Sequence, residues 1–393
     1  MTLFGHTFRL AAAWMAISVA WVVPAAAGDW SLKTSLSETL SANDNLGFVA
    51  DPDGNVIGTN SRLGLDLVRK SHIDEFLLNG SLGYQTYFGD YGDIPGDRLL
   101  PSLRTSYLRR GKTTDVSFGA SYILTPASTD TGLEIADDAQ SGDRQTYSVN
   151  TSVVHKINAR NDVTLAARAS KTDFINGGAA DTPFTTLGST LTWKRQETKR
   201  VDFTLSSSLD WYDYDDALNR QRLYYVLRGG TQARLSKRLT INAGLGGTLS
   251  DTSHDVLFPP PERDGNTSVG TLADLGFSYL LKSGSMSGGL SYGLTPDDNG
   301  DFQNNLSFNA AFTHRINDLM DFRLGGQYVR SDSDVNGNLA NSTFSISPSL
   351  SYTLARDWLL NASYQFAWKD YEAGNAYQNA VYLTLTRNYV LMP

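Results

Sequence analysis

The residues of this sequence that could do chemistry are basic side chains set into segments where polar and apolar residues alternate. Arg104, Arg168 and Arg228 stand near the middle of three such segments. In a β-strand, successive side chains point to opposite faces, so alternation gives each strand one apolar and one polar face. The arginines fall on the polar faces, where their permanently charged guanidinium groups could pair with carboxylates or phosphates.

The polar faces carry more basic than acidic residues, and this excess has two interpretations. Arg–Asp ladders could brace the wall of a sheet, or the basic groups could form a ring that favours anions. A mid-strand arginine on a lipid-facing side would cost about 2–4 kcal/mol, which favours inward placement in a membrane barrel. The basic candidates are Lys33, Arg62, Arg104, Arg168, Lys194, Arg222, Arg228, Arg234, Arg323 and Lys369. The acidic candidates are Asp66, Asp115, Asp162, Asp202, Asp210, Asp274 and Asp321. The residues expected to set the selectivity of a lumen are Lys33, Arg62, Arg104, Arg168, Arg222, Arg228, Arg323 and Lys369.

An enzyme would need a nucleophile or an activated water beside a base. Among the histidines of the chain beyond residue 27, only His254, between Ser253 and Asp255, is placed in a long loop where a barrel enzyme could use it. Neighbours in sequence do not make a catalytic constellation, and the sequence contains no Gly-rich phosphate loop, metal-ligand cluster or nucleic-acid motif. We therefore predict no enzymatic activity, no cofactor and no metal site.

The strand pattern is clearest in Leu239–Ser250, where apolar or small residues occupy every second position. One such strand could also be half of a soluble sheet, but the pattern repeats at about twenty-residue spacing to the end of the chain. We predict a single antiparallel, up-and-down, transmembrane β-barrel over residues 28–393, with about eighteen strands and sixteen as the alternative. Its outward aromatic girdle would include Tyr122, Trp193, Trp211, Tyr279, Trp358 and Trp368.

Short turns and long polar loops alternate along the chain, as in barrels of the bacterial outer membrane. The sequence thus predicts a protein of the cell outer membrane, with long loops outside and short turns in the periplasm. Its partners would be outer-membrane lipid, lipopolysaccharide and the barrel assembly machinery. Acidic loops could bridge to lipopolysaccharide through Ca²⁺ or Mg²⁺. Ser41–Thr59 and Thr125–Asp143 are the loops best placed to fold in and narrow the lumen.

The N-terminus has the features of a cleaved secretory signal. Arg9 precedes the apolar run Leu10–Val23, and the small residues of Pro24–Ala27 follow. This run is short for a transmembrane anchor, so we expect residues 1–27 to be removed as a signal peptide. The chain has no cysteine, and its formal net charge of -8 argues against a nucleic-acid partner.

The segment Ser35–Leu46 and the strand Arg62–Val68 resemble the first strands and loop of a β-barrel porin family. Members of that family look like outer-membrane proteins often encoded with exopolysaccharide synthesis and export systems. The resemblance implies a channel or export role and a polysaccharide export system as a partner, and it supplies no catalytic residues. The chain departs from the usual aromatic ending of such barrels, because Arg387 interrupts the last strand and Val390–Pro393 follows it.

The function favoured by the sequence is a channel that passes small solutes or exports an acidic exopolysaccharide through a basic lumen. A structural or adhesive barrel with a closed lumen is the alternative, and a barrel hydrolase is the third possibility.

Overall fold

The computed structural model describes residues 29–48, 54–89, 97–126, 143–175, 182–216, 219–255, 263–296, 302–333, 341–371 and 374–392. The prediction of a signal peptide over residues 1–27 lies outside these ranges and stays a prediction. Within the described ranges, no helix is long and apolar enough to span a membrane.

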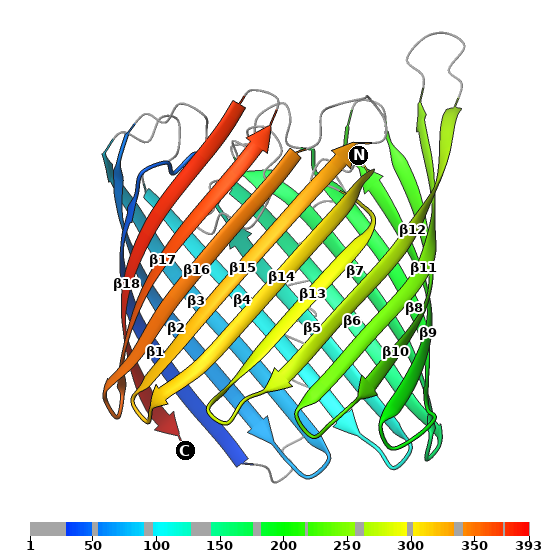
Figure 1. Ribbon diagram of the computed structural model, residues 1–393, viewed down its shortest axis with the longest axis horizontal. Helices are drawn as coiled ribbons and strands as arrows, with labels where there is room; N and C mark the ends of the chain where they lie inside the picture. The colour runs from blue at the N-terminus through cyan, green and yellow to red at the C-terminus, as the bar shows by residue number, and fades with distance from the viewer. Residues whose placement is uncertain are drawn as a thin grey trace.

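The chain forms one closed antiparallel sheet of 18 strands, which confirms the predicted barrel (Figure 1). The strands are β1 (Asp29–Asn43), β2 (Val56–Lys70), β3 (Asp74–Gly89), β4 (Asp97–Arg110), β5 (Thr114–Thr125), β6 (Asp143–Asn158), β7 (Asn161–Ile175), β8 (Phe184–Gln196), β9 (Val201–Tyr214), β10 (Gln221–Arg234), β11 (Leu239–Asp255), β12 (Arg263–Leu280), β13 (Gly284–Pro296), β14 (Phe302–Asn317), β15 (Met320–Ser333), β16 (Asn341–Ala355), β17 (Trp358–Tyr371) and β18 (Gly374–Met392).

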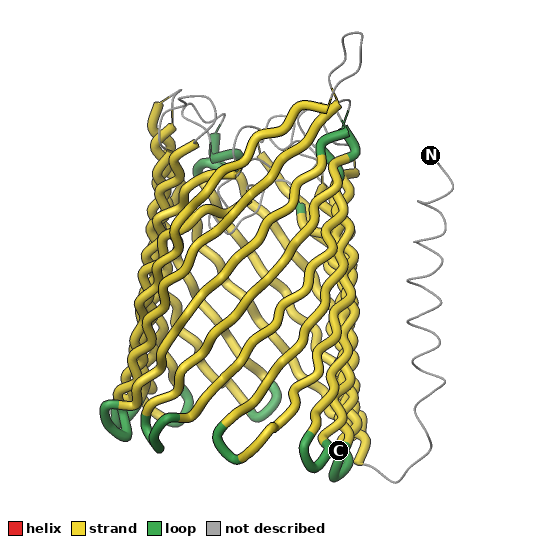
Figure 2. Tube along the Cα trace, turned by 90° about the vertical axis from the view of Figure 1, so that its right-hand side faces the viewer, coloured by secondary structure: helices red, strands yellow, loops and turns green. Residues whose placement is uncertain are grey.

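Each strand pairs with its neighbours in sequence, and β1 pairs with β18 to close the ring. Short turns join the strands at one end, which we call the turn end (Figure 2). Longer segments join them at the opposite end, which we call the loop end. Strand boundaries agree closely with the sequence pattern at the turn end. At the loop end β11 runs to Asp255, beyond the predicted Ser250, and β1 and β2 extend into the predicted loop Ser41–Thr59, because backbone pairing continues there.

The register places most of the alternating apolar residues on one side of the sheet. Directly paired residues share a face, and the pairing around the ring sets Leu245 of β11 and Val269 of β12 on the same side, with 73% and 80% of their surfaces exposed. On the opposite face, side chains of strands that are not neighbours meet, as Arg168 of β7 and Asp210 of β9 do. That polar face is therefore the inward one, and the exposed leucines form an outward apolar belt.

The last strand accommodates Arg387 without losing its register. β18 pairs with β1 from Ala380 to Met392, with one irregularity at Leu32/Lys33 of β1. Arg387 points outward, and its guanidinium carbon lies 5.1 Å from the ring centroid of Trp358 and 4.7 Å from that of Tyr389. These cation–π contacts at the turn end stabilise the positive charge of Arg387. The sequence pattern alone could not explain a charged residue at this outward position of β18.

A pair of neighbouring positions in the middle of β8 tests the assignment of faces. Leu191 points outward and Thr190 inward. We expect Leu191→Arg to lower stability in lipid vesicles by about 2–4 kcal/mol, because the charge would lie in hydrocarbon. Thr190→Arg at the same depth should change stability far less. Urea titrations of barrel refolding measure both, and equal losses would contradict the assignment of faces.

Candidate functional site

The structure places all the predicted basic and acidic candidates on the inward face. For example, Arg62 lies opposite Gly83 in register, and Arg104 lies opposite Asn79. Whether these residues set selectivity stays a prediction. The same alternation brings further charged residues inward that sequence analysis missed, because they lie at strand ends. These are Lys70, Glu75, Arg98, Arg110, Arg144, Lys156 and Arg315.

Three carboxylates on β9 and β12 each bind inward cations from nearby strands. Asp210 accepts from the Arg168 guanidinium, with an Nη2–Oδ1 distance of 2.8 Å. The carboxylate oxygen Oδ1 of Asp274 lies 2.5 Å from Arg228 Nη2. Asp202 lies 3.3 Å from both Lys194 Nζ and Arg234 Nη2. These pairs run from the turn end toward the loop end along one wall, so part of the predicted basic set does brace the barrel.

The acid and the base of each pair are not equally exposed. The Asp210 side chain is 6% exposed, whereas that of its partner Arg168 is 60% exposed. Asp202 is likewise buried beneath the half-exposed Lys194 and Arg234. The carboxylates therefore lie against the wall and the cations lie above them. A solute in the lumen would meet the positive side of each pair.

Two of these pairs span an intervening strand, and a glycine makes this possible. Arg168 on β7 reaches Asp210 on β9 across Gly188 of β8, and the three residues lie in one row of the register. Arg228 on β10 reaches Asp274 on β12 past Gly244 of β11. A Cβ at Gly188 would collide with the Asp210 carboxylate and lie 2.8 Å from Arg168 Nε. The glycine leaves space for a long side chain to lie flat on the wall.

The other basic candidates divide into exposed and buried groups. Among the described residues, Lys33, Arg62, Arg104 and Arg323 are exposed and have no acidic partner within 4.0 Å. Arg222 and Lys369 are buried instead. The Arg222 Nε donates to Thr252 Oγ1 at 2.6 Å. The exposed group is therefore the part of the predicted ring that faces open space.

An aromatic cluster narrows the inward face toward the loop end of β8–β10. Tyr212, Tyr214 and Tyr224 pack with Leu294, and Phe184 packs against them. The Tyr224 hydroxyl donates to the carbonyl oxygen of Leu294 at 2.5 Å. Because Leu294 belongs to β13, this contact crosses β11 and β12.

The upper part of β13 therefore separates from β12, although it stays paired with β14, and its Leu294 packs on the inner side. Pairing of β12 with β13 begins at Leu280 and stops at Ala273, although β12 extends back to Arg263. Leu294 is 1% exposed, although the alternation of β13 would place it outward. Figure 1 shows the upper end of β13 bending away from β12. Sequence analysis missed this segment, because neither its composition nor its periodicity marks a strand that leaves its neighbour.

A second segment folds inward from the opposite side of the ring. Leu46, between β1 and β2, packs with the inward residues Val56 and Tyr87. The side-chain amide Nδ2 of Asn45 donates to the backbone carbonyl oxygen of Tyr377 at 2.9 Å. The side-chain amide Nε2 of Gln378 donates to the backbone carbonyl oxygen of Asn45 at 2.8 Å. Strands β1 and β10 lie on opposite sides of the 18-stranded ring, so the loop end is narrowed from two sides.

These contacts lie within one of the two loops predicted to narrow the lumen, and the narrowing itself stays a prediction. The part of Ser41–Thr59 that the structure describes lies against the inner wall through Leu46. Nearly all of Thr125–Asp143 lies outside the described residues, as does the side chain of His254. Within the described part of the chain, no three His, Asp or Glu side chains gather in a way that could hold a metal ion.

Comparison with known proteins finds similarity in structure but not in sequence. No family model matches the chain, and no significant relative is found among curated proteins. OccAB2 of Acinetobacter baumannii superimposes with a TM-score of 0.50 and 10% identity, over 92% of this chain and 98% of that one. The ferric-catecholate import receptor Fiu of E. coli K12 gives 0.51 and 10%, over 92% and 82%. The copper transporter OprC gives 0.52 and 12%, over 89% and 65%. At these identities the comparisons show the barrel fold.

Replacement of Gly188 tests the ion-pair brace. We expect Gly188→Ala to lower stability by about 1–3 kcal/mol, because its methyl group would overpack the Arg168–Asp210 pair. Gly229→Ala is the control, since a Cβ there has no atom within 4 Å and should stabilise the strand slightly. Thermal unfolding in micelles measures both. A stabilised Gly188→Ala barrel would contradict the brace.

The bond between Tyr224 and Leu294 gives a second test. Tyr224→Phe leaves the buried Leu294 carbonyl without its donor, at a cost of about 1–3 kcal/mol, and should loosen the inward end of β13. If the lumen conducts, its single-channel conductance should then rise or fluctuate. Tyr225→Phe is the control, because Tyr225 points outward and only accepts a hydrogen bond from Ser207. Unchanged conductance in Tyr224→Phe would show that this bond does not hold the narrowing in place.

Proposed function

We propose that this protein is a non-enzymatic channel of the bacterial outer membrane, whose basic lumen passes small solutes and favours anions. The observation that carries the proposal is the exposure pattern on the inward face. Asp202 and Asp210 are buried under their basic partners, while Arg62, Arg104 and Arg323 face the lumen without an acidic partner among the described residues. Guanidinium groups remain charged at any physiological pH, so the lumen keeps a positive potential.

The outward apolar belt supports a place in a membrane. In hydrocarbon every backbone group must be paired within the protein, and a closed barrel achieves this with strands. The aromatic residues predicted for a girdle all fall on the outward face by register, as Trp193 and Tyr279 illustrate. In such a membrane the loop end would face outside and the turn end the periplasm. The three similar barrels named above are described as OccAB2, an import receptor and a copper transporter.

We favour small solutes over a polymer as the cargo. The resemblance of Ser35–Leu46 to an exopolysaccharide-associated family implies export of an acidic polysaccharide, but the comparisons give this role no support. The loop end is narrowed from opposite sides by Leu46 and Leu294, which suits molecules of limited cross-section. The same narrowing keeps the closed structural barrel as a second candidate, which conductance measurements would separate.

Reversal potentials in a KCl gradient test the proposed selectivity. The wild-type channel should pass chloride more readily than potassium. Removing the exposed cations in Arg62→Gln/Arg104→Gln/Arg323→Gln should lower the chloride-to-potassium permeability ratio roughly two- to threefold, given the strength of screened charges about one Debye length away.

The control for this measurement removes the same net charge from the other face. Arg109, Arg195 and Arg330 point outward near strand ends, so Arg109→Gln/Arg195→Gln/Arg330→Gln should leave the ratio unchanged. A cation-selective wild type, or equal shifts in both triple variants, would refute a lumenal origin of selectivity. A barrel without conductance would favour the closed structural alternative. Passage of acidic oligosaccharides as readily as chloride would favour export.

A further inference from the structure

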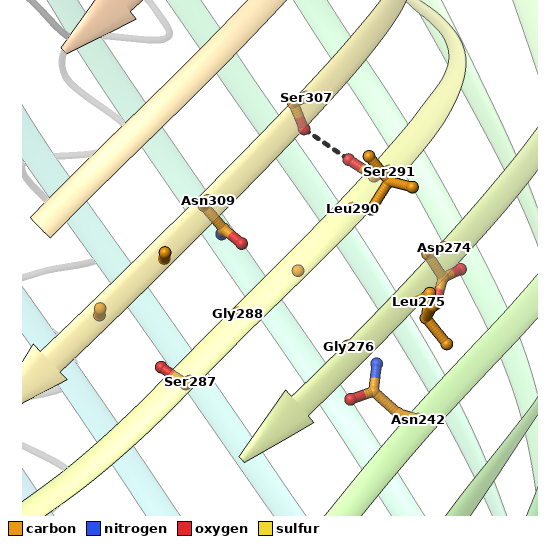
Figure 3. A pocket seen from close by; sticks show the side chains of 13 residues that line it. Asn242, Asp274, Leu275, Gly276, Ser287, Gly288, Leu290, Ser291, Ser307 and Asn309 are labelled. Carbon is orange, nitrogen blue, oxygen red and sulfur yellow. Dashed lines mark hydrogen bonds between the residues drawn. The ribbon is translucent and has the colours of Figure 1, made fainter. Parts of the chain in front are cut away.

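A polar recess lies in the inward wall where β11, β12, β13 and β14 run side by side (Figure 3). Its volume is about 370 Å³, within the range of roughly 300–1,000 Å³ typical of small-molecule sites. The polar side chains in its lining include Asn242, Asp274, Ser287, Ser291, Ser307 and Asn309. None of the residues that line the recess belongs to the aromatic cluster described above.

The floor of the recess is made by two glycines that pair with each other. Gly276 of β12 lies opposite Gly289 of β13. The residues that continue this row on the flanking strands are Asn242 of β11 and Asn309 of β14. An ideal Cβ at Gly276 would lie 2.7 Å from Asn242 Oδ1, and one at Gly289 would lie 2.6 Å from Asn309 Oδ1. Each amide therefore lies over the neighbouring glycine, and the two amides approach each other across the pair β12–β13.

The hydrogen-bonding groups of the recess are only partly used. Among the described residues, neither Asn242 nor Asn309 has a side-chain hydrogen-bond partner, and both are exposed to the lumen. Each amide can donate two hydrogen bonds and accept two. Ser291 and Ser307, in the next row, bond to each other through their hydroxyls at 2.6 Å, as Figure 3 shows. Two opposed amides thus remain available to a ligand that offers both donors and acceptors.

The lining also limits the charge and polarity of the ligand. A free anion would be repelled by the Asp274 carboxylate, and a free cation would compete with Arg228, which already binds that carboxylate at 2.5 Å. The leucines at the edge of the recess, Leu275 and Leu290, occupy outward positions of their strands, so they offer little apolar surface to the lumen. The remaining ligand class is neutral, compact and rich in hydroxyl groups.

We propose that this recess is a binding site for a small neutral polyhydroxylated ring, such as a monosaccharide. Asn242 and Asn309 bind ring hydroxyls from two sides, with both donors and acceptors, and the missing side chains of Gly276 and Gly289 let both amides lie low on the wall beneath the ring. The proposal goes beyond an anion-favouring channel, and it rests on that function only for access of the solute to the lumen.

Binding of D-glucose to the purified full-length barrel tests the proposal. The protein is held in a detergent without a sugar headgroup, and saturation-transfer difference NMR records a glucose titration. We expect a saturable signal for the wild type. In Asn242→Ala/Asn309→Ala the affinity should fall about tenfold or more, because at least two neutral hydrogen bonds are lost. Triethylene glycol, which has few hydroxyl donors, should give no saturable signal.

A matched control uses another inward asparagine that lies over a glycine. Asn150 of β6 covers Gly119 of β5 in the same way but lies outside the recess. Asn150→Ala should bind glucose like the wild type. Gly289→Val should abolish binding, because its side chain would displace the Asn309 amide and fill the floor.

The measurement separates this proposal from the proposed channel. Binding in micelles does not depend on conductance, so a barrel that conducts chloride but gives no saturable glucose signal overturns the sugar site alone. A barrel that binds glucose in the recess but does not conduct retains the site and refutes the channel. Equal glucose affinity in the wild type and in Asn242→Ala/Asn309→Ala also overturns the proposed site.

Discussion

Closure of the sheet by β1 and β18 is the constraint on which the rest of this structure depends. An open edge leaves backbone N–H and C=O groups unpaired, whereas each described strand pairs with both of its neighbours over at least part of its length, and β1 and β18 complete the ring. The ring fixes the register of every strand, and a shift by one residue would exchange the inward and outward faces. The leucine belt and the charged lumen are therefore two consequences of the same pairing.

Within the ring, the paired acidic side chains lie close to the wall and their basic partners lie farther into the lumen. Asp202 and Asp210 lie beneath their partners, so they hold basic side chains in place while contributing little negative charge to the lumen surface. Gly188 and Gly244 make this possible by leaving space over the intervening strand. For Arg168, bracing of the wall and the proposed attraction of anions are compatible. It is held by Asp210, and it still presents an exposed guanidinium.

Departures from the regular barrel concentrate where a solute would have to pass. The upper end of β13 and the segment containing Leu46 fold inward from opposite sides, each fixed by backbone-directed hydrogen bonds and apolar contacts. Below them, small residues on β11–β14 leave a polar recess in the wall. A narrow entrance above a recess with unused amides is an arrangement that could select solutes by size and by hydrogen bonding.

The sequence by itself determined the architecture and the composition of both faces. Alternation with a period of two is a local property, so strands such as Leu239–Ser250 and the inward placement of Arg104, Arg168 and Arg228 could be predicted without coordinates. Only the tertiary structure decided which charges are paired, because Arg168 and Asp210 meet across a strand whose register depends on the whole ring. It also decided that Arg387 stacks on Trp358 and Tyr389, and that Leu294 turns inward against its own alternation. These features arise from contacts between residues distant in sequence, and no local pattern encodes them.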